Sequence, residues 1–457
     1  MGQKAKIFKS ALQIMAFCIL ASKGCSFIGT LLASLKKKKT LLLLNQILKE
    51  KRLVKPSKSI IEEKIVLKPS KNIIEEKIVE VKPSKSINHK DVDRAMKIHF
   101  PEEIIVDILS RLPVRSLLRF KCASKFWKSL ISEPHFKTKH WNHAKNNKKF
   151  QKLLIGRMFP TAYDKRVGTI SYYCSSLSSA QLVEGVQKLG CPSNDKPCGY
   201  IMLCCCDGLS LLWSHGDHLL WNPSTNESAV LPNPEFPPVS GSTYGMGYDS
   251  TIDDYKIFKI DDNMGYGSNP PSKILALKSG SWRKIDNHPR GFRNSVSGKD
   301  SLAFIHGAFH WISMDILYEY FMVSFNISNE VYGEIPLPEG ICNISNAVIH
   351  GVSVLDGMLC AYCTYRNAEA GTFKFWVMKD YGVNESWTEL FTMRGTLLCL
   401  AIPMYRFADG EVLFYYEDGG YLGFKTSKGP FGLLPAYLTL QQGFIYTESL
   451  ISPKLLT

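Results

Sequence analysis

Short runs of strand-forming residues, separated by glycine turns, occupy the chain from about Ile155 onward. An Asp-Gly or His-Gly pair recurs before or within these runs, at Asp207-Gly208, His306-Gly307, Asp356-Gly357 and Asp409-Gly410. The intervals between the glycines are 99, 50 and 53 residues, and the missing middle position falls near residues 244–256. Repeats of about fifty residues built from short strands are typical of β-propeller blades, which close radially and leave few free edges. About 300 residues at this interval predict about six blades; a pair of irregular β-sandwiches is the alternative.

A second pattern, at residues 99–136, is helical. Its first apolar positions recur at helical spacing, at Ile104, Ile105, Ile108, Leu109 and Leu112. Pro113 cannot continue that helix, and Ser124 is a suitable N-cap for a third helix after a short second one. Three small helices cannot bury this many large apolar groups by themselves, so some of them are expected to face a partner.

The same stretch resembles the plant form of the F-box. The residues that carry the resemblance are Pro101-Glu102-Glu103, Ile108 to Val114, Leu117 to Phe120, Cys122, Ser124-Lys125, Trp127, Leu130-Ile131 and Pro134-His135-Phe136. Phe100 stands where the family usually has Leu, and Ala123 where Val is common; both replacements are apolar. The resemblance implies binding to a Skp-type adaptor, which links the protein to a cullin in an SCF ubiquitin ligase. The residues that it assigns to adaptor binding are Phe100, Pro101, Ile104, Ile108, Leu109, Leu112, Pro113, Leu117, Leu118, Cys122 and Trp127.

The β-rich part resembles the plant F-box-associated domain, a kelch-type propeller that captures a target protein. The resemblance rests on short sequence motifs that occur in the same order as in the family over some 240 residues. These are Cys206 to Leu209, Leu220 to Thr225, Gly245 to Asp249, Asp254 to Lys256, Ser281 to Arg283, Gly307 to Trp311, Phe325 to Glu330, Ile335 to Pro338, Leu355 to Leu359, Trp376 to Lys379, Tyr381-Gly382 and Ser386-Trp387. Asn326 stands where the family usually has Asp.

The N-terminal extension differs from the rest in charge. Residues 1–98 hold 22 Lys and Arg against 8 Asp and Glu, so the net charge of +15 lies almost entirely there. The remainder is nearly neutral, which argues against nucleic acid as a partner. Residues 55–87 repeat the motif KPSK with an IIEEKIV core, in units too short to form stable helices. A flexible charged linker is expected, and a short helical docking motif used multivalently is the alternative. We therefore expect an α+β multidomain chain with a disordered basic extension at 1–95, a three-helix F-box at 96–145, and an all-β, kelch-like propeller at 150–455.

Residues 11–35 form two apolar runs broken by Lys23 and Gly24, which is short for a membrane span. A membrane anchor, a signal peptide and an unstructured artefactual extension are the open interpretations. The third is favoured because the F-box partner is cytosolic or nuclear, and so the protein is expected in the cytoplasm or nucleus.

No catalytic or metal-binding motif is present in the sequence. P-loop, HExxH and GxSxG patterns are absent. Cys360 and Cys363 form a lone CxxC motif, whereas a structural zinc site needs two pairs of ligand residues. The 13 cysteines are irregularly spaced, which favours reduced thiols. His306 and His310 are expected to be structural, and the tryptophans are spaced like core or inter-blade anchors. The predicted function is a non-catalytic, cofactor-free adaptor that holds a target for ubiquitin transfer. The alternative is a carbohydrate-binding or enzymatic propeller, secreted if the leader is a signal peptide, with sequons at Asn226, Asn326, Asn343 and Asn384.

Overall fold

The computed structural model describes residues 102–457 with internal gaps. The gaps are residue 146 and residues 161–167, 178–185, 193–198, 215–216, 235–241, 262–271, 287, 289–291, 295–301, 316–319, 339–340, 342–346, 366–371, 395–399, 419–420, 427–428 and 431–439. The predictions for the basic extension, for the apolar runs at 11–35 and for the repeat at 55–87 lie outside the described residues.

Four helices open the described part of the chain: α5 (Glu102–Leu109), α6 (Val114–Ala123), α7 (Lys125–Ser132) and α8 (Pro134–Ala144). The first helix ends before Pro113, as predicted. Ser124 caps α7, because its hydroxyl accepts a hydrogen bond from the backbone N–H of Trp127 at 3.2 Å. The sequence pattern predicts three helices, whereas the structure has a fourth, α8, whose apolar stripe is weak. Its one clear signal is Pro134 in the first turn, where a helix tolerates proline.

Six antiparallel sheets follow the helices. The first contains β1 (Gln151–Pro160), β2 (Gly168–Ser176), β3 (Gln187–Lys188) and the last strand, β25 (Leu440–Thr447). The second contains β4 (Ile201–Cys206), β5 (Leu209–Ser214), β6 (Asp217–Asn222) and β7 (Glu227–Leu231). The third contains β8 (Thr243–Asp249), β9 (Asp254–Ile260), β10 (Lys273–Ala276) and β11 (Ser281–Lys284).

The remaining three sheets continue the series in chain order. The fourth contains β12 (Phe292–Asn294), β13 (Ala303–Ile305), β14 (Ala308–Asp315), β15 (Tyr320–Asn326) and β16 (Tyr332–Ile335). The fifth contains β17 (Ala347–Leu355), β18 (Met358–Tyr365), β19 (Thr372–Met378) and β20 (Trp387–Arg394). The sixth contains β21 (Leu400–Arg406), β22 (Val412–Asp418), β23 (Tyr421–Thr426) and β24 (Gly429–Pro430). Short 3₁₀ turns are η1 (Lys148–Phe150), η3 (Asn384–Ser386) and η4 (Pro453–Leu455).

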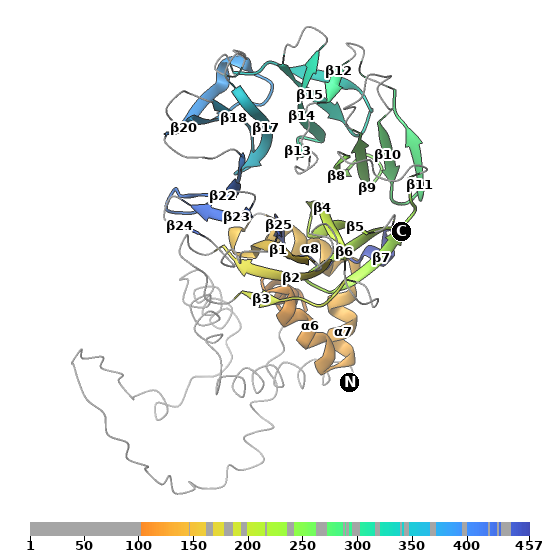
Figure 1. The fold of residues 1–457 in the computed structure, drawn as a ribbon. Helices are drawn as coiled ribbons and strands as arrows, with labels where there is room; N and C mark the ends of the chain where they lie inside the picture. Colours follow the sequence, from red (N-terminus) through yellow and green to blue (C-terminus); the bar gives the residue numbers. More distant parts are fainter. Residues whose placement is uncertain are drawn as a thin grey trace, which may run out of the picture. The chain divides into compact units, whose positions relative to one another are not determined.

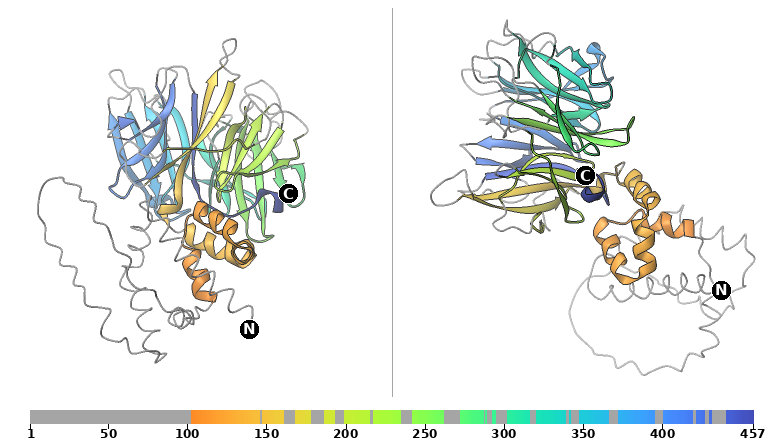
Figure 2. Two further views of the ribbon diagram at one scale, coloured as in Figure 1. Left: turned by 90° about the horizontal axis from the view of Figure 1, so that it is seen from below. Right: turned by 90° about the vertical axis from the view of Figure 1, so that its right-hand side faces the viewer.

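The six sheets are the blades of a β-propeller and surround a common axis (Figures 1 and 2). The ring is closed by the C-terminal strand, because β25 pairs with β1 from Gln151 opposite Thr447 to Met158 opposite Leu440. The segment after β25 is tied to the second blade, where the side-chain amide of Asn222 donates to the carbonyl oxygen of Ile451 at 2.8 Å. The predicted propeller of about six blades is confirmed.

The recurring Asp-Gly and His-Gly pairs form the turns that the sequence predicts. Asp207, His306 and Asp356 have φ values of 49°, 51° and 52°, and each is followed by a glycine with a φ above 70°. Glycine is required after Asp207, because a Cβ on Gly208 would collide with the carbonyl oxygen of Thr447 in the closing strand. The missing position is the turn between β8 and β9, where Asp253 takes a φ of 53° without a following glycine.

Tryptophans anchor neighbouring blades at equivalent places. The indole N–H of Trp282, on β11, donates to the carbonyl oxygen of Pro232 at 2.8 Å. The indole N–H of Trp387, on β20, donates to the carbonyl oxygen of Pro336 at 2.9 Å. Each bond joins the fourth strand of one blade to the chain that leaves the blade before it. The predicted inter-blade role is confirmed for these two residues.

Acidification is expected to weaken the propeller through His310. This residue is 1% exposed, and its Nε2 lies 2.8 Å from the hydroxyl of Tyr381 in the next blade. Burial is the main reason that the pKa of His310 falls from its ordinary 6.5 to about 4. Below pH 6.5 the unfolded chain therefore binds a proton that the folded chain does not, so stability falls as the pH falls. From pH 7 to pH 5 we expect a loss of about 2 kcal/mol from this group.

The measurement is urea unfolding at both pH values, followed by tryptophan fluorescence. The variant His310→Asn removes the titrating ring and is expected to reduce the difference between the two pH values by about the same amount. An identical pH dependence in the variant and the natural chain would remove His310 as the cause.

Candidate functional site

The four helices divide the predicted adaptor-binding residues into an inner and an outer group. Leu109, Leu117 and Trp127 are 3%, 0% and 1% exposed. Trp127 lies against two further aromatic rings, those of Phe126 and Phe120, with centroids 5.3 and 6.2 Å away. These inner residues hold the helices together in the free chain.

The outer group is apolar and reaches solvent. Ile108 is 43% exposed, Pro113 and Cys122 are exposed, and Ile104, Leu112 and Leu118 are half-buried. Leu118 and Cys122 are four residues apart on α6 and therefore lie on one face of that helix. Phe100 and Pro101 lie outside the described residues. Single exposed apolar residues are common on protein surfaces, whereas a group of them on neighbouring helical positions is a feature of a surface that binds a partner.

Two contacts that the sequence does not reveal fix the loop between α5 and α6. His140 of α8 is fully buried, and its Nε2 lies 3.1 Å from the carbonyl oxygen of Leu112. Burial lowers the pKa of His140, so the ring is neutral at pH 7 and its Nε2–H donates this bond. Asp107 binds Arg111 at 3.1 Å and Lys139 of α8 at 3.4 Å. The contacts of His140 and Lys139 depend on α8, the helix that the sequence pattern does not predict.

The connection from α8 into the first blade is short and packed. The Phe150 ring, which is 5% exposed, lies edge-on to the rings of His140 and His143, with centroids 5.7 and 5.6 Å away. Lys148 forms an ion pair with Asp356, in the turn between β17 and β18, and donates to the carbonyl oxygen of Arg406 at 3.1 Å. These contacts restrain the segment that joins the helices to the propeller.

The two edges of the propeller differ in the length of their connections. The turns with positive φ all join the first strand of a blade to its second, or the third to the fourth, and most of them are short. These turns lie on one edge of the propeller, the edge at which β1, the second strand of the first blade, begins. Because strands alternate in direction, the connections on the opposite edge join the second strand to the third, or one blade to the next. Several of these are longer: residues 232–242 link β7 to β8, and residues 261–272 link β9 to β10.

Side chains that could hold a metal ion do not gather in the described residues. No cluster of three or more His, Cys, Asp or Glu side chains is placed to hold a metal ion there. The cysteines within the described ranges are free thiols, including Cys360 and Cys363. None of the helices in this part of the chain is long and apolar enough to cross a membrane.

Comparison with known proteins identifies the two parts of the chain. A family model of the F-box domain matches residues 98–139, and a model of the F-box associated beta propeller domain matches residues 159–421, more than half of the chain. F-box protein CPR1 of Arabidopsis thaliana is 28% identical over 318 residues, which cover 64% of this chain and 73% of that protein. F-box/kelch-repeat protein At3g23880 of the same plant is 25% identical over 372 residues, which cover 78% and 96%. The chain is therefore an F-box protein with a C-terminal F-box-associated β-propeller domain.

Proposed function

We propose that this chain is the substrate-recognition subunit of an SCF-type ubiquitin ligase. F-box proteins are generally non-catalytic adaptors, and the F-box implies a Skp-type adaptor as partner. In this proposal the helices bind the adaptor and through it a cullin, and the propeller binds a target protein. The chain itself transfers no ubiquitin; it holds the target so that transfer by other subunits becomes effectively intramolecular. Because the adaptor is cytosolic or nuclear, the protein is expected to act in the cytoplasm or nucleus.

The group of apolar side chains that reach solvent on the helices, with Ile108 the most exposed large aliphatic residue among them, is the observation that supports the adaptor surface best. The predicted residues that retain solvent contact after the helices have packed are Ile104, Ile108, Leu112, Pro113, Leu118 and Cys122. Covering them would remove apolar area from water, which is the main driving force of association. Phe100 and Pro101, which lie outside the described residues, stay in the proposal as adaptor-binding residues that the family resemblance implies. Leu109, Leu117 and Trp127 are proposed to contribute by holding the helices in shape.

Replacing Ile108 by Glu is expected to weaken capture of a purified Skp-type adaptor at least tenfold. Loss of a buried aliphatic contact costs about 2–5 kcal/mol, and a carboxylate buried at an interface adds a desolvation cost. The matched control is Val230→Glu, since Val230 is also an exposed aliphatic residue, at 70%, but lies on β7 of the propeller. The measurement is adaptor affinity by surface plasmon resonance, with a thermal melt of each variant. Unchanged affinity in a folded Ile108→Glu chain would refute the proposed surface.

The edge with the longer connections is the proposed face for the target. Long loops on a rigid scaffold are the usual place for recognition residues. On the opposite edge the turns contact one another across blades: the Tyr255 hydroxyl donates to Asp207 at 3.0 Å, and the Ser328 hydroxyl donates to Asp249 at 2.8 Å. These groups are engaged within the propeller, and Asp356 of the same edge is bound by Lys148.

A further inference from the structure

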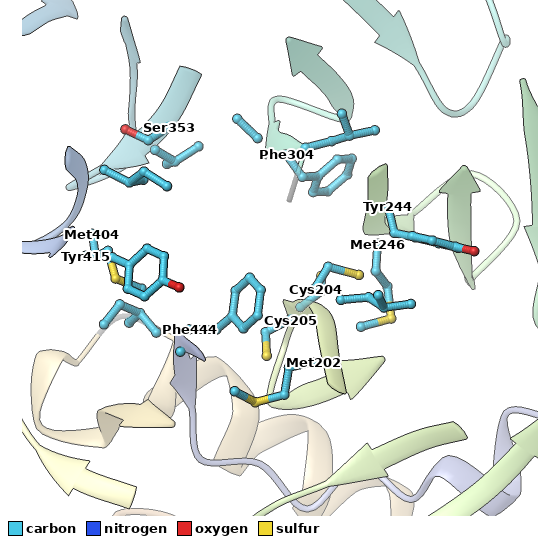
Figure 3. Close-up of a pocket in the computed structure, with 18 of the residues that line it drawn as sticks. Met202, Cys204, Cys205, Tyr244, Met246, Phe304, Ser353, Met404, Tyr415 and Phe444 are labelled. Carbon is cyan, nitrogen blue, oxygen red and sulfur yellow. The ribbon is translucent and has the colours of Figure 1, made fainter. Parts of the chain in front are cut away.

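A cavity of about 540 Å³ lies where strands of all six blades meet at the centre of the propeller (Figure 3). Its walls come from β1, β4, β8, β13, β17, β21, β22 and β25. Figure 3 shows Phe304, Tyr415 and Phe444 around the open centre, with Met202 and Met404 beside them. The volume falls within the range that small-molecule sites occupy in proteins.

The lining of the cavity consists largely of flexible apolar and aromatic side chains, and it carries almost no charge. Three methionines, Met202, Met246 and Met404, supply thioether groups that adapt their shape to a ligand. The described lining holds no Lys, Arg or His. Its one carboxylate, Asp207, already accepts a hydrogen bond from Tyr255. The lining therefore offers no cation for an anionic ligand and no free carboxylate for a cationic one.

The neighbouring thiols belong to the apolar wall. Cys204 is 1% exposed, and burial raises its pKa well above the ordinary value. Burial also raises the pKa of Cys205 to about 12. Both groups are thus protonated at neutral pH, and a protonated thiol is a poor nucleophile and a poor metal ligand. These cysteines are expected to contact a ligand by packing.

Two hydroxyl groups of the lining have unused hydrogen-bonding capacity. Thr243, on β8, is 2% exposed, and its Oγ1 makes no hydrogen bond to any described residue. Ser353, on β17, has a buried Oγ that is likewise without a partner in the described part of the chain. Buried hydroxyls are normally paired, because a donor removed from water without a partner is unfavourable. The two hydroxyls stand on different blades, with the blade of β13 between them.

We propose that this central cavity binds a neutral, ring-bearing small molecule that carries hydrogen-bond acceptors. The aromatic and thioether side chains enclose its rings. The hydroxyls of Thr243 and Ser353 are buried in the free chain, so in this proposal the two side chains rotate about χ1 when the ligand binds and donate to its acceptors. A carbonyl compound with a fused or biaryl ring system has the right chemistry. The site is built by the propeller alone, so it does not depend on the proposed adaptor surface.

The test uses two fluorescent naphthalenes that share a ring system and differ in charge. Prodan is neutral and has a ketone acceptor, whereas ANS carries a sulfonate. Titration of the folded full-length chain is expected to give saturable binding of one prodan per chain. ANS is expected to bind at least tenfold more weakly, because the lining holds no cation. If prodan does not bind saturably, the cavity holds water only. If ANS binds as tightly as prodan, the cavity takes apolar dyes without selection. Either result would overturn the proposal.

Variants then locate the binding. Thr243→Val keeps the shape of the side chain and removes the hydroxyl, and is expected to weaken prodan binding about 3- to 10-fold. Ser353→Trp fills the cavity and is expected to abolish binding. The controls are Thr169→Val and Ser281→Trp, which make the same replacements at exposed positions on β2 and β11. If Ser353→Trp does not fold, the Thr243→Val variant tests the proposal by itself. An unchanged affinity for prodan in the folded Thr243→Val chain would refute the role of the hydroxyl. Adaptor affinity, measured on the same variants, is expected to stay unchanged, which separates this site from the proposed ligase function.

Discussion

Ending the chain after Pro403 is expected to unfold the whole propeller, and not the sixth blade alone. The truncation removes β22 to β24 and also β25, the strand that pairs with β1 along its length. It also removes the segment whose Ser449 and Ile451 carbonyl oxygens accept hydrogen bonds from Asn222 of the second blade. The first blade would then expose the edge of β1, and apolar faces of the fifth and first blades would lose their neighbours. The loss is expected to exceed the 5–15 kcal/mol that stabilises a typical domain.

The measurement is circular dichroism with a thermal melt of the truncated chain. The control is a chain that ends after Ser452, which keeps β25 and the contacts of Asn222 and loses only the last turn. We expect a cooperative melt in the control and none in the chain that ends at Pro403. Native β-structure with a cooperative melt in the shorter chain would contradict the view that closure stabilises all blades together.

Replacing Lys256 by Met is expected to destabilise the propeller by about 3–5 kcal/mol, the usual cost of leaving a buried charge without its partner. Lys256 Nζ lies 3.0 Å from Asp249, whose side chain is fully buried, and donates to the carbonyl oxygen of Ile327 in the next blade at 2.6 Å. Burial alone would raise the pKa of Asp249. Hydrogen bonds from Thr251, Lys256 and Ser328 outweigh it, so the pKa lies well below its ordinary value and the carboxylate is charged. Without the lysine, that charge would remain buried between two blades.

The matched control is Lys278→Met. Lys278 also pairs with an aspartate, Asp253, at 3.3 Å, but the two side chains are 51% and 82% exposed. Exposed pairs contribute about 0–1 kcal/mol, so this variant is expected to change the free energy of unfolding by less than 1 kcal/mol. Combining Lys256→Met with Asp249→Asn removes both charges and is expected to recover part of the loss. Equal effects of the two lysine variants in urea unfolding would mean that burial of the pair does not matter.

Local features of the chain were readable from the sequence because nearby residues decide them. Proline at 113 ends α5, and the Ser124 hydroxyl caps α7 through a bond to a residue three positions ahead. Apolar and β-branched runs predict the strands; the run at 373–378, for example, lies in β19. The turns at Asp207, His306 and Asp356 need a residue with a positive φ followed by a glycine. The Asp-Gly or His-Gly dipeptide therefore predicts the turn without any information from distant residues. The regular interval of those turns was enough to give the propeller and its approximate number of blades.

Other features depend on residues far apart in the chain, and only the tertiary structure decides them. Ile108 and Leu109 are adjacent and equally apolar in sequence, yet one is 43% exposed and the other 3%, because the packing of the helices determines which side faces inward. The helix α8 lacks a strong apolar stripe, and part of its stability comes from the contacts of His140 with Leu112 and Phe150. The central cavity is lined by strands from all six blades. Sequence periodicity could predict those blades, but the cavity exists only after β25 has paired with β1 and closed the ring, because closure brings residues nearly 300 positions apart into contact.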